Sequence, residues 1–234
     1  MNLSLSFIIP AYNDANTIKK TVLAADAVGK KIKANYEIIV INDASIDNTQ
    51  AEINKISPKL KNLKIYFHKK NKGYGETIKE LYYAANKSWI FSIPGDLQID
   101  AKEVLKLIPF IDEYDMIIGK RINRSDTFLR RSQSRIYNSL LRILFNLRLS
   151  DVNSVRLLKS GVLKKIRLES KSAFVDAELA IKMQRNNFKT IEAPITHRSR
   201  DAEGGGGGSM KIILPTITEL IIFYLFGKNE STYL

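Results

Sequence analysis

The stretch WIFSIPGDLQID, residues 89–100, joins an apolar strand to a tight turn and then to a group of polar side chains. Its first five residues are apolar apart from one serine, which is typical of a strand buried on both faces of a parallel sheet. Pro94 and Gly95 predict a turn, and Asp96 and Gln98 follow it. Ligands of parallel α/β sheets bind at the carboxyl ends of the strands. The stretch therefore predicts a ligand site where this strand ends.

The same alternation of strands and helices runs through the first half of the chain. Strand patterns are LSFIIP (5–10), YEIIVI (36–41), LKIYFH (63–68), SWIFSI (88–93) and YDMIIG (114–119). Helical spacing of apolar residues is present in ANTIKKTVLAADAV (15–28) and GETIKELYYAANK (75–87). Strands separated by helices of this length predict right-handed βαβ units. We therefore expect an α/β fold with a mixed, mainly parallel sheet flanked by helices.

The second half is dominated by basic residues and helical patterns. SQSRIYNSLLRILFNL (132–147) and FVDAELAIKMQRN (174–186) predict amphipathic helices, and FKTIEAPI (188–195) predicts a strand. The glycine run 204–208 predicts a flexible loop. IILPTITELIIFYLF (212–226) is apolar but too short to span a bilayer. It predicts a C-terminal helix that either lies in a membrane interface or packs on the core or on another subunit.

Charge and cysteine content limit the classes of function. The formal net charge of +13 predicts an anionic partner, which could be nucleic acid, a phosphorylated small molecule or an acidic membrane. The chain has no zinc-finger, helix-turn-helix or RNA-binding signature, so nucleic acid is not the expected partner. The absence of cysteine excludes disulfides, thiolate nucleophiles and cysteine zinc sites. The first residues lack the features of a signal peptide and predict a strand.

Polar residues follow four of the predicted strands, and their loops should meet at one edge of the sheet. The four segments are 10–14, 42–49, 71–75 and 94–98. Asp43 can accept a hydrogen bond from a base N–H or a ribose hydroxyl, and Gly73 permits close approach of the backbone. Asp96 and Gln98 offer the hard oxygens that Mg²⁺ or Mn²⁺ prefers. Together these loops predict a site for a metal-bound nucleoside diphosphate.

Ordered motifs over nearly the whole chain resemble those of one enzyme family. FIIPAYNDANTI, EIIVINDASIDNT, NKGYGETIKEL and WIFSIPGDLQID resemble the nucleotide-sugar half of the family 2 glycosyltransferases, which have the GT-A fold. GKR, RRSQSRIYN, SDVNSVRLLK, VDAEL, IEAPI and GSMK are similar to the dolichyl-phosphate mannosyltransferase-like subgroup, which uses polyprenyl-phosphate acceptors. The resemblance implies one domain over residues 1–211, with a nucleotide-sugar half (1–100) and an acceptor half (101–211). Residues 212–234 would form the C-terminal helix and tail.

The resemblance also implies roles for individual residues. The residues implied to bind the nucleotide sugar are Pro10, Ala11, Tyr12, Asp14, Asn42, Asp43, Lys72, Gly73 and Gly95. Mg²⁺ or Mn²⁺ would be held on the diphosphate by Asp96 and Gln98. The catalytic residues would be Asp96, Arg121 and Arg131. Acceptor or donor phosphate would meet Arg121, Arg131, Ser134, Arg200, Ser209 and Lys211.

Two positions depart from the family pattern. Pro94 stands where the family usually has the first carboxylate of an Asp-x-Asp pair, and Asp14 replaces the more common Glu. One carboxylate and one amide form a weaker metal site than two carboxylates. We therefore expect the substrate phosphates to supply part of the metal's ligands.

The acceptor determines whether a general base is needed. A hydroxyl acceptor needs a base to take its proton, whereas a phosphate is already ionised. Asp176 and Glu178 are the candidates for a base, and they fit the polar face of a helix equally well. We expect inverting transfer from a GDP- or UDP-sugar to a polyprenyl phosphate or similar lipid-linked acceptor, at the cytoplasmic face of a membrane. The alternatives are transfer to a sugar hydroxyl in polysaccharide or lipopolysaccharide assembly, and a non-catalytic nucleotide-sugar-binding protein. A homo-oligomer is left open.

Overall fold

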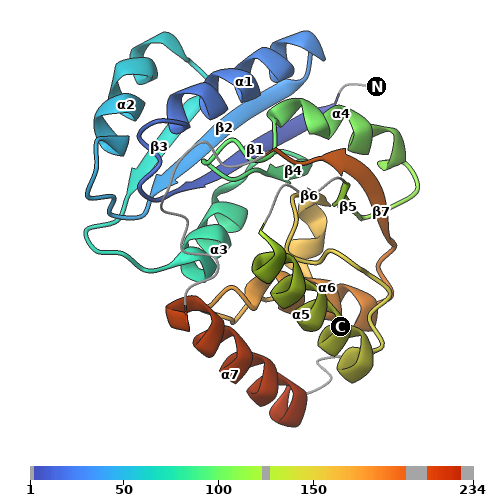
Figure 1. Ribbon diagram of the computed structural model, residues 1–234. Helices are drawn as coiled ribbons and strands as arrows, with labels where there is room; N and C mark the ends of the chain where they lie inside the picture. The colour runs from blue at the N-terminus through green and yellow to red at the C-terminus, as the bar shows by residue number, and fades with distance from the viewer. Residues whose placement is uncertain (1–2, 123–126, 199–209, 228–234) are drawn as a thin grey trace.

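The computed structural model describes residues 3–122, 127–198 and 210–227, and these contain one seven-stranded sheet (Figure 1). The strands are β1 (Ser4–Ala11), β2 (Asn35–Asn42), β3 (Leu63–Phe67), β4 (Trp89–Ser92), β5 (Met116–Ile122), β6 (Arg156–Lys159) and β7 (Thr190–Thr196). They lie in the order β3-β2-β1-β4-β6-β5-β7. β6 is antiparallel to both of its neighbours, and the other pairs are parallel. The expected mixed, mainly parallel sheet is confirmed.

β6 connects the two halves of the chain and is a strand that the sequence analysis did not predict. Leu157 of β6 lies opposite Phe91 of β4 on one side and opposite Ile117 of β5 on the other. The strand has the sequence RLLK, so its apolar signal is only two residues long. Pairing with two neighbours, rather than a local pattern, therefore determines this strand.

Helices cover both faces of the sheet (Figure 1). One face carries α1 (Ile18–Lys31), α2 (Thr49–Ile56) and α4 (Val104–Leu107), and the other carries α3 (Tyr74–Ala84), α5 (Phe128–Phe145), α6 (Val175–Arg185) and α7 (Met210–Phe226). Short 3₁₀ segments occur at Ser57–Lys59, Ala101–Glu103, Ile108–Phe110 and Ser160–Lys164. Along β1, Phe7 and Ile9 belong to the first apolar layer and Ile8 belongs to the second. Because side chains alternate along a strand, one continuous apolar strand fills both layers.

The C-terminal helix α7 packs on the domain along one face. Glu219 accepts a hydrogen bond from Ser172 Oγ (2.6 Å), and Leu220 is buried in the second apolar layer. The ring of Phe223 lies 5.3 Å from that of Phe174, measured between centroids. The opposite face leaves large apolar side chains exposed, among them Ile221. Among the helices within the described residues, none is long and apolar enough to cross a membrane.

Some predicted features cannot be compared with the structure. Arg200, Ser209 and the glycine run 204–208 lie outside the described residues.

Candidate active site

Each of the four predicted loops contains a residue with a left-handed backbone. These residues are Asn13, Ala44, Gly73 and Leu97, with φ of 55°, 56°, 84° and 59°. For a residue other than glycine this conformation costs about 1–2 kcal/mol. Such strain persists only where the surrounding structure holds it, and it is concentrated at functional sites. All four loops at the carboxyl edge of the sheet therefore contain a residue with positive φ, and three of these residues are not glycine.

Hydrogen bonds join the loops after β1, β2 and β4. The N–H of Asn13 donates to Ser45 Oγ (3.0 Å), and the N–H of Ile46 donates to Asn13 Oδ1 (3.0 Å). Thr21 of α1 donates from Oγ1 to the carbonyl oxygen of Gly95 (3.1 Å). These contacts confirm that loops far apart in the sequence meet at one edge of the sheet.

Asp43, directly after β2, organises the loop that follows β3. Its carboxylate accepts hydrogen bonds from the backbone N–H groups of Lys72 (2.8 Å) and Gly73 (2.9 Å). A third partner is Nδ1 of His68, 2.6 Å from Asp43 Oδ1. The backbone carbonyl of Asp43 accepts a hydrogen bond from Asn71 Nδ2 (3.1 Å). Three predicted nucleotide-binding residues, Asp43, Lys72 and Gly73, are thus in direct contact.

Asp14, in the loop after β1, lies against the turn after β4. Its Oδ2 accepts a hydrogen bond from the N–H of Tyr12 (3.1 Å), and its own N–H donates to Thr49 Oγ1 (2.8 Å). A Cβ atom added at Gly95 would lie 2.7 Å from Asp14 Oδ2, so a side chain there would displace this carboxylate. Asp14 therefore places a negative charge beside the turn in which Pro94 replaces a carboxylate.

The remaining residues predicted for the nucleotide have contacts within the loops. Asn42 donates from Nδ2 to Gln50 Oε1 (2.9 Å), and its Oδ1 accepts a hydrogen bond from Ser45 Oγ (2.6 Å). Ala11 is buried, and its carbonyl oxygen accepts a hydrogen bond from the N–H of Asp43 (2.9 Å). Pro10 lies in β1 opposite Ile41. These three residues shape the edge, and their contact with a nucleotide stays a prediction.

Asp96 and Gln98 flank Leu97 in the turn after β4. The N–H of Gln98 donates to Asp96 Oδ1 (3.0 Å), and the carbonyl oxygen of Gln98 accepts a hydrogen bond from the N–H of Arg198 (2.9 Å). The carboxylate and the amide are oxygen ligands that suit Mg²⁺ or Mn²⁺ when phosphate and water complete the shell. No group of three His, Cys, Asp or Glu side chains suited to a metal occurs within the described residues. A metal at this turn would therefore depend on phosphates of the ligand.

Arg121 of β5 is held by a partner that the sequence analysis missed. Its Nε and Nη2 donate to the carboxylate of Asp151 at 2.9 and 2.6 Å, and its backbone N–H donates to the same group at 3.0 Å. The N–H of Asp151 in turn donates to Glu192 Oε1 of β7 (2.8 Å). A bidentate pair of this kind fixes the plane of the guanidinium. Because 30 positions separate the two residues, no local pattern could have revealed the pair.

Asp176, a candidate base, lies in a buried polar cluster. Its Oδ1 is 2.9 Å from Nη1 of Arg156, which is only 1% exposed, and its Oδ2 accepts a hydrogen bond from the hydroxyl of Tyr74 (3.0 Å). Burial raises the pKa of Asp176, and the adjacent guanidinium opposes that increase. Burial, together with the Asp176 carboxylate, raises the pKa of the Tyr74 hydroxyl well above its usual range. The cluster also links the loop after β3 to α6, because Tyr74 directly follows Gly73 of that loop.

Glu178, the second candidate base, is bound on the far side of α6. Its carboxylate accepts hydrogen bonds from the N–H groups of Glu169 and Ser170, both at 2.9 Å, and lies 2.9 Å from Nζ of Lys182. These contacts stabilise the 169–170 turn. They weigh against the prediction that Glu178 acts as a base.

Besides Arg121, the described residues predicted for the acceptor phosphate lie on α5 and at the start of α7. Arg131 is exposed in the first turns of α5, and the carbonyl oxygen of Ser134 accepts a hydrogen bond from Asn138 Nδ2 (2.8 Å). Asn138 Oδ1 accepts a hydrogen bond from the N–H of Val152 (3.0 Å), which fixes α5 beside the loop that holds Asp151. Lys211 is exposed at the start of α7.

Comparison with known proteins identifies the family. The model of "Glycosyl transferase family 2" matches residues 6–167. This chain belongs to glycosyl transferase family 2. Its fold is the GT-A fold: it aligns with glucosyl-3-phosphoglycerate synthase from Mycobacterium tuberculosis, solved with Mn²⁺, UDP and phosphoglyceric acid, with a TM-score of 0.69. That alignment covers 99% of this chain and 80% of the other at 12% identity.

Two curated relatives of this family 2 glycosyltransferase act on polyprenyl phosphates by name. The undecaprenyl-phosphate 4-deoxy-4-formamido-L-arabinose transferase of Edwardsiella ictaluri is 28% identical over 220 residues, which is 89% of this chain. The dodecaprenyl-phosphate galacturonate synthase of Rhizobium johnstonii is 24% identical over 236 residues, which is 97% of this chain. The chain spans 64% and 69% of the lengths of these relatives.

Proposed function

We propose that this glycosyltransferase moves a sugar, with inversion, from a nucleoside diphosphate to the phosphate of a polyprenyl lipid. An oxygen of the acceptor phosphate attacks the anomeric carbon, while the bond from that carbon to the diphosphate breaks and the diphosphate leaves with the electron pair. The names of the two curated relatives support the acceptor class.

The observation that carries the proposal is the burial of both candidate bases. Asp176 is paired with Arg156, and Glu178 is bound by two N–H groups and Lys182. Side chains that are 3% and 1% exposed, for Asp176 and Glu178, lie out of reach of a hydroxyl acceptor in this conformation, whatever their pKa. A phosphate needs no base, because it reaches the site already ionised. The arrangement therefore favours a phosphate acceptor over a sugar hydroxyl.

Different residues at the strand ends would bind the nucleoside, the metal ion and the acceptor phosphate. Asp43 and the Lys72–Gly73 backbone would hold the nucleoside, and Asp96 and Gln98 would hold Mg²⁺ or Mn²⁺ on the diphosphate. Such an ion, when bound, stabilises the negative charge that develops on the departing diphosphate. Arg121, oriented by Asp151, would hold an oxygen of the acceptor phosphate in line with the anomeric carbon.

A donor screen tests the proposal. UDP-, GDP- and dTDP-sugars are incubated with the protein and Mn²⁺, with and without a short polyprenyl phosphate, and release of the nucleoside diphosphate is measured. Release that depends on the lipid phosphate is the expected result. Tight binding of a nucleotide sugar without release under any condition would instead support a binding protein that has lost catalysis. Release that depends on a sugar hydroxyl acceptor would overturn the acceptor class.

We expect Arg121→Lys to raise the KM for polyprenyl phosphate about tenfold. Lysine keeps the positive charge but cannot make the bidentate pair with Asp151, so its charge would no longer be held in one orientation. The KM for the nucleotide sugar should change little, and initial-rate kinetics with each substrate varied in turn separate the two constants. Arg142→Lys, on the exposed surface of α5, is the matched control. Equal increases in both KM values for Arg121→Lys would contradict an acceptor role.

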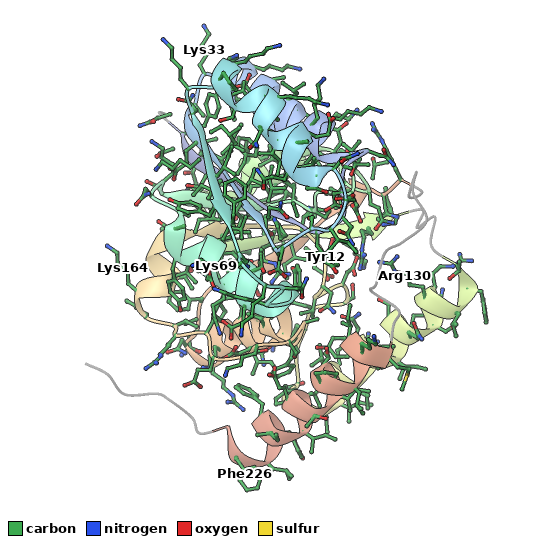
Figure 2. All side chains as sticks on the ribbon, turned by 90° about the vertical axis from the view of Figure 1, so that its left-hand side faces the viewer. Tyr12, Lys33, Lys69, Arg130, Lys164 and Phe226 are labelled. Carbon is green, nitrogen blue, oxygen red and sulfur yellow. The ribbon has the colours of Figure 1, made fainter. Side chains whose placement is uncertain are left out.

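The exposed apolar residues of α5 and α7 support a position on a membrane surface. They are Phe128, Leu129, Ile136, Leu140 and Ile143 on α5, and Met210, Leu214, Ile217, Ile221, Ile222, Tyr224, Leu225 and Phe226 on α7. The two helices touch where Phe145 meets Phe223, with ring centroids 5.9 Å apart. Figure 2 shows Arg130 near the start of α5 and Phe226 at the end of α7, both on the outside of the molecule. Apolar side chains beside arginines fit the interface of an anionic bilayer, where a polyprenyl phosphate is embedded.

We expect the double substitution Ile221→Asp and Leu225→Asp to weaken binding to vesicles that contain anionic lipid by about tenfold or more. Two charges on the exposed face of α7 would have to leave water on binding, and the buried face with Leu220 is unchanged. Flotation of the protein with vesicles measures the bound fraction. Leu23→Asp, on α1 at the opposite face of the sheet, is the control. Equal flotation of all three proteins would show that α7 does not contact lipid.

A further inference from the structure

The ring of His68 lies between two carboxylates, one of which, Asp43, is predicted to accept a hydrogen bond from a base N–H or a ribose hydroxyl. Nδ1 is 2.6 Å from Asp43 Oδ1, and Nε2 is 3.0 Å from Glu80 Oε2. The side chain of His68 is 6% exposed, and that of Asp43 is 5% exposed. Glu80 also accepts a hydrogen bond from Lys72 Nζ (2.7 Å). The backbone N–H of Lys72 donates to Asp43. Hydrogen bonds therefore link the four residues in a closed ring: Asp43, His68, Glu80 and Lys72.

The positions of the two carboxylates limit which ring nitrogens of His68 can donate a hydrogen bond. A neutral imidazole has one N–H, so one of its nitrogens would face a carboxylate with a lone pair. Only the imidazolium donates to Asp43 and to Glu80 at once. Burial raises the pKa of Glu80, but hydrogen bonds from Lys72 and His68 outweigh it and hold that pKa below its ordinary value. In either state a ring that carries the Nδ1–H can donate to Asp43, and Lys72 Nζ supplies a donor to Glu80.

The network decides which lone pair of Asp43 a ligand can use. An ionised carboxylate has about four lone-pair positions. Oδ1 accepts from His68 Nδ1 and from the N–H of Lys72, whereas Oδ2 accepts from the N–H of Gly73. Among the described residues, His68 therefore fills the second position on Oδ1, and the remaining position is on Oδ2. Without His68 a position on Oδ1 would also be open to a ligand, and the carboxylate would be held through the N–H groups of Lys72 and Gly73.

We infer that His68 is a positioning residue for nucleotide binding, which acts by fixing the Asp43 carboxylate. The inference rests on the proposed function, because that function assigns the nucleoside of the donor to Asp43 and the Lys72–Gly73 backbone. The backbone of His68 is held independently of its ring, since its N–H donates to the carbonyl of Asn42 (3.0 Å) at the end of the β2–β3 pairing. Substitution of the side chain should therefore leave the loop in place.

Two amide substitutions test the contacts of the two ring nitrogens of His68 separately. His68→Asn places an N–H donor where Nδ1 reaches Asp43, and His68→Gln extends its amide toward Glu80 instead. We expect His68→Gln to weaken binding of UDP or GDP, whichever the wild type prefers, by about tenfold in the presence of Mn²⁺. His68→Asn should stay within about threefold of the wild type. Calorimetry measures both, and Lys69→Ala, an exposed neighbour, is the matched control.

Inorganic pyrophosphate distinguishes positioning from general damage. It carries phosphates without a base, so its Mn²⁺-dependent affinity should be the same for the wild type and both His68 variants. In kinetics, His68→Gln should raise the KM for the nucleotide sugar and leave kcat nearly unchanged, because the base is remote from the reacting bond. Equal nucleotide affinity of the Asn and Gln variants, or parallel losses for pyrophosphate, would overturn the inference. Failure of the wild type to bind any nucleotide would overturn the proposed function itself.

Discussion

Asp96→Asn should abolish the Mn²⁺-dependent part of nucleotide-sugar binding and lower kcat by about 10²–10³-fold. Asp96 is the one carboxylate that the turn after β4 offers, since Pro94 occupies the position of the other, and an asparagine amide keeps the shape but not the charge. The hydrogen bond from the N–H of Gln98 can still reach the amide oxygen, so the turn should keep its conformation. Calorimetry with UDP- and GDP-sugars, with Mn²⁺ and with EDTA, measures the metal-dependent difference.

Two further variants make this test specific. Asp100→Asn removes a carboxylate four positions later that caps a 3₁₀ segment through the N–H of Lys102, and it should keep metal-dependent binding. Pro94→Asp adds the second carboxylate of the Asp-x-Asp pattern and should lower the Mn²⁺ concentration needed for half-maximal binding. Unchanged metal dependence in Asp96→Asn would remove the metal from this turn.

Asp176→Asn should destabilise the protein by about 3–5 kcal/mol. The change would leave the guanidinium of Arg156 buried without its counter-charge, and breaking a buried ion pair from one side costs far more than replacing both partners. The double variant Arg156→Met and Asp176→Leu should therefore recover much of the loss. Urea denaturation followed by circular dichroism measures the free energy of unfolding of each protein.

The same variant decides between the two roles of Asp176. A structural carboxylate predicts low stability, with nearly normal kcat for the molecules that remain folded. A catalytic base predicts a large loss of kcat even in the molecules that remain folded. Activity measured at low temperature, where Asp176→Asn is still folded, separates these outcomes, and the second would count against the phosphate acceptor as well.

Local patterns were sufficient to predict the strands of the first half and the loops that meet at their ends. The strand WIFSI, the Pro-Gly turn and Asp96 are adjacent in the chain. The pattern of apolar residues and the turn-forming residues therefore predict their places without knowledge of the fold. The structure confirms that hydrogen bonds join the loop containing Asn13 to the loop containing Ser45. The loop containing Gly95 is bonded to Thr21 of α1, the helix that follows the first of these loops. The resemblance to family 2 glycosyltransferases was confirmed in the same region and beyond it.

Partners across long sequence separations could not be predicted in this way. Asp151 holds Arg121 from 30 positions away, and His68 contacts Asp43 from 25 positions away. Neither pair has a periodic signal, because each depends on which strands become neighbours. β6 was missed for the same reason. The docked face of α7 was also not predictable, since its apolar residues surround the helix and Ser172, the hydrogen-bond partner of Glu219, lies 47 positions away.

The position of β6 has a consequence for how the two substrates come together. Because β6 is bonded to β4 on one side and to β5 on the other, the turn that carries Asp96 and the strand that carries Arg121 belong to one rigid body. A hinge between the halves would have to break this ladder. If Asp96 and Arg121 hold the two substrates as proposed, the spacing between the departing diphosphate and the incoming phosphate would be set when the chain folds, before either substrate binds.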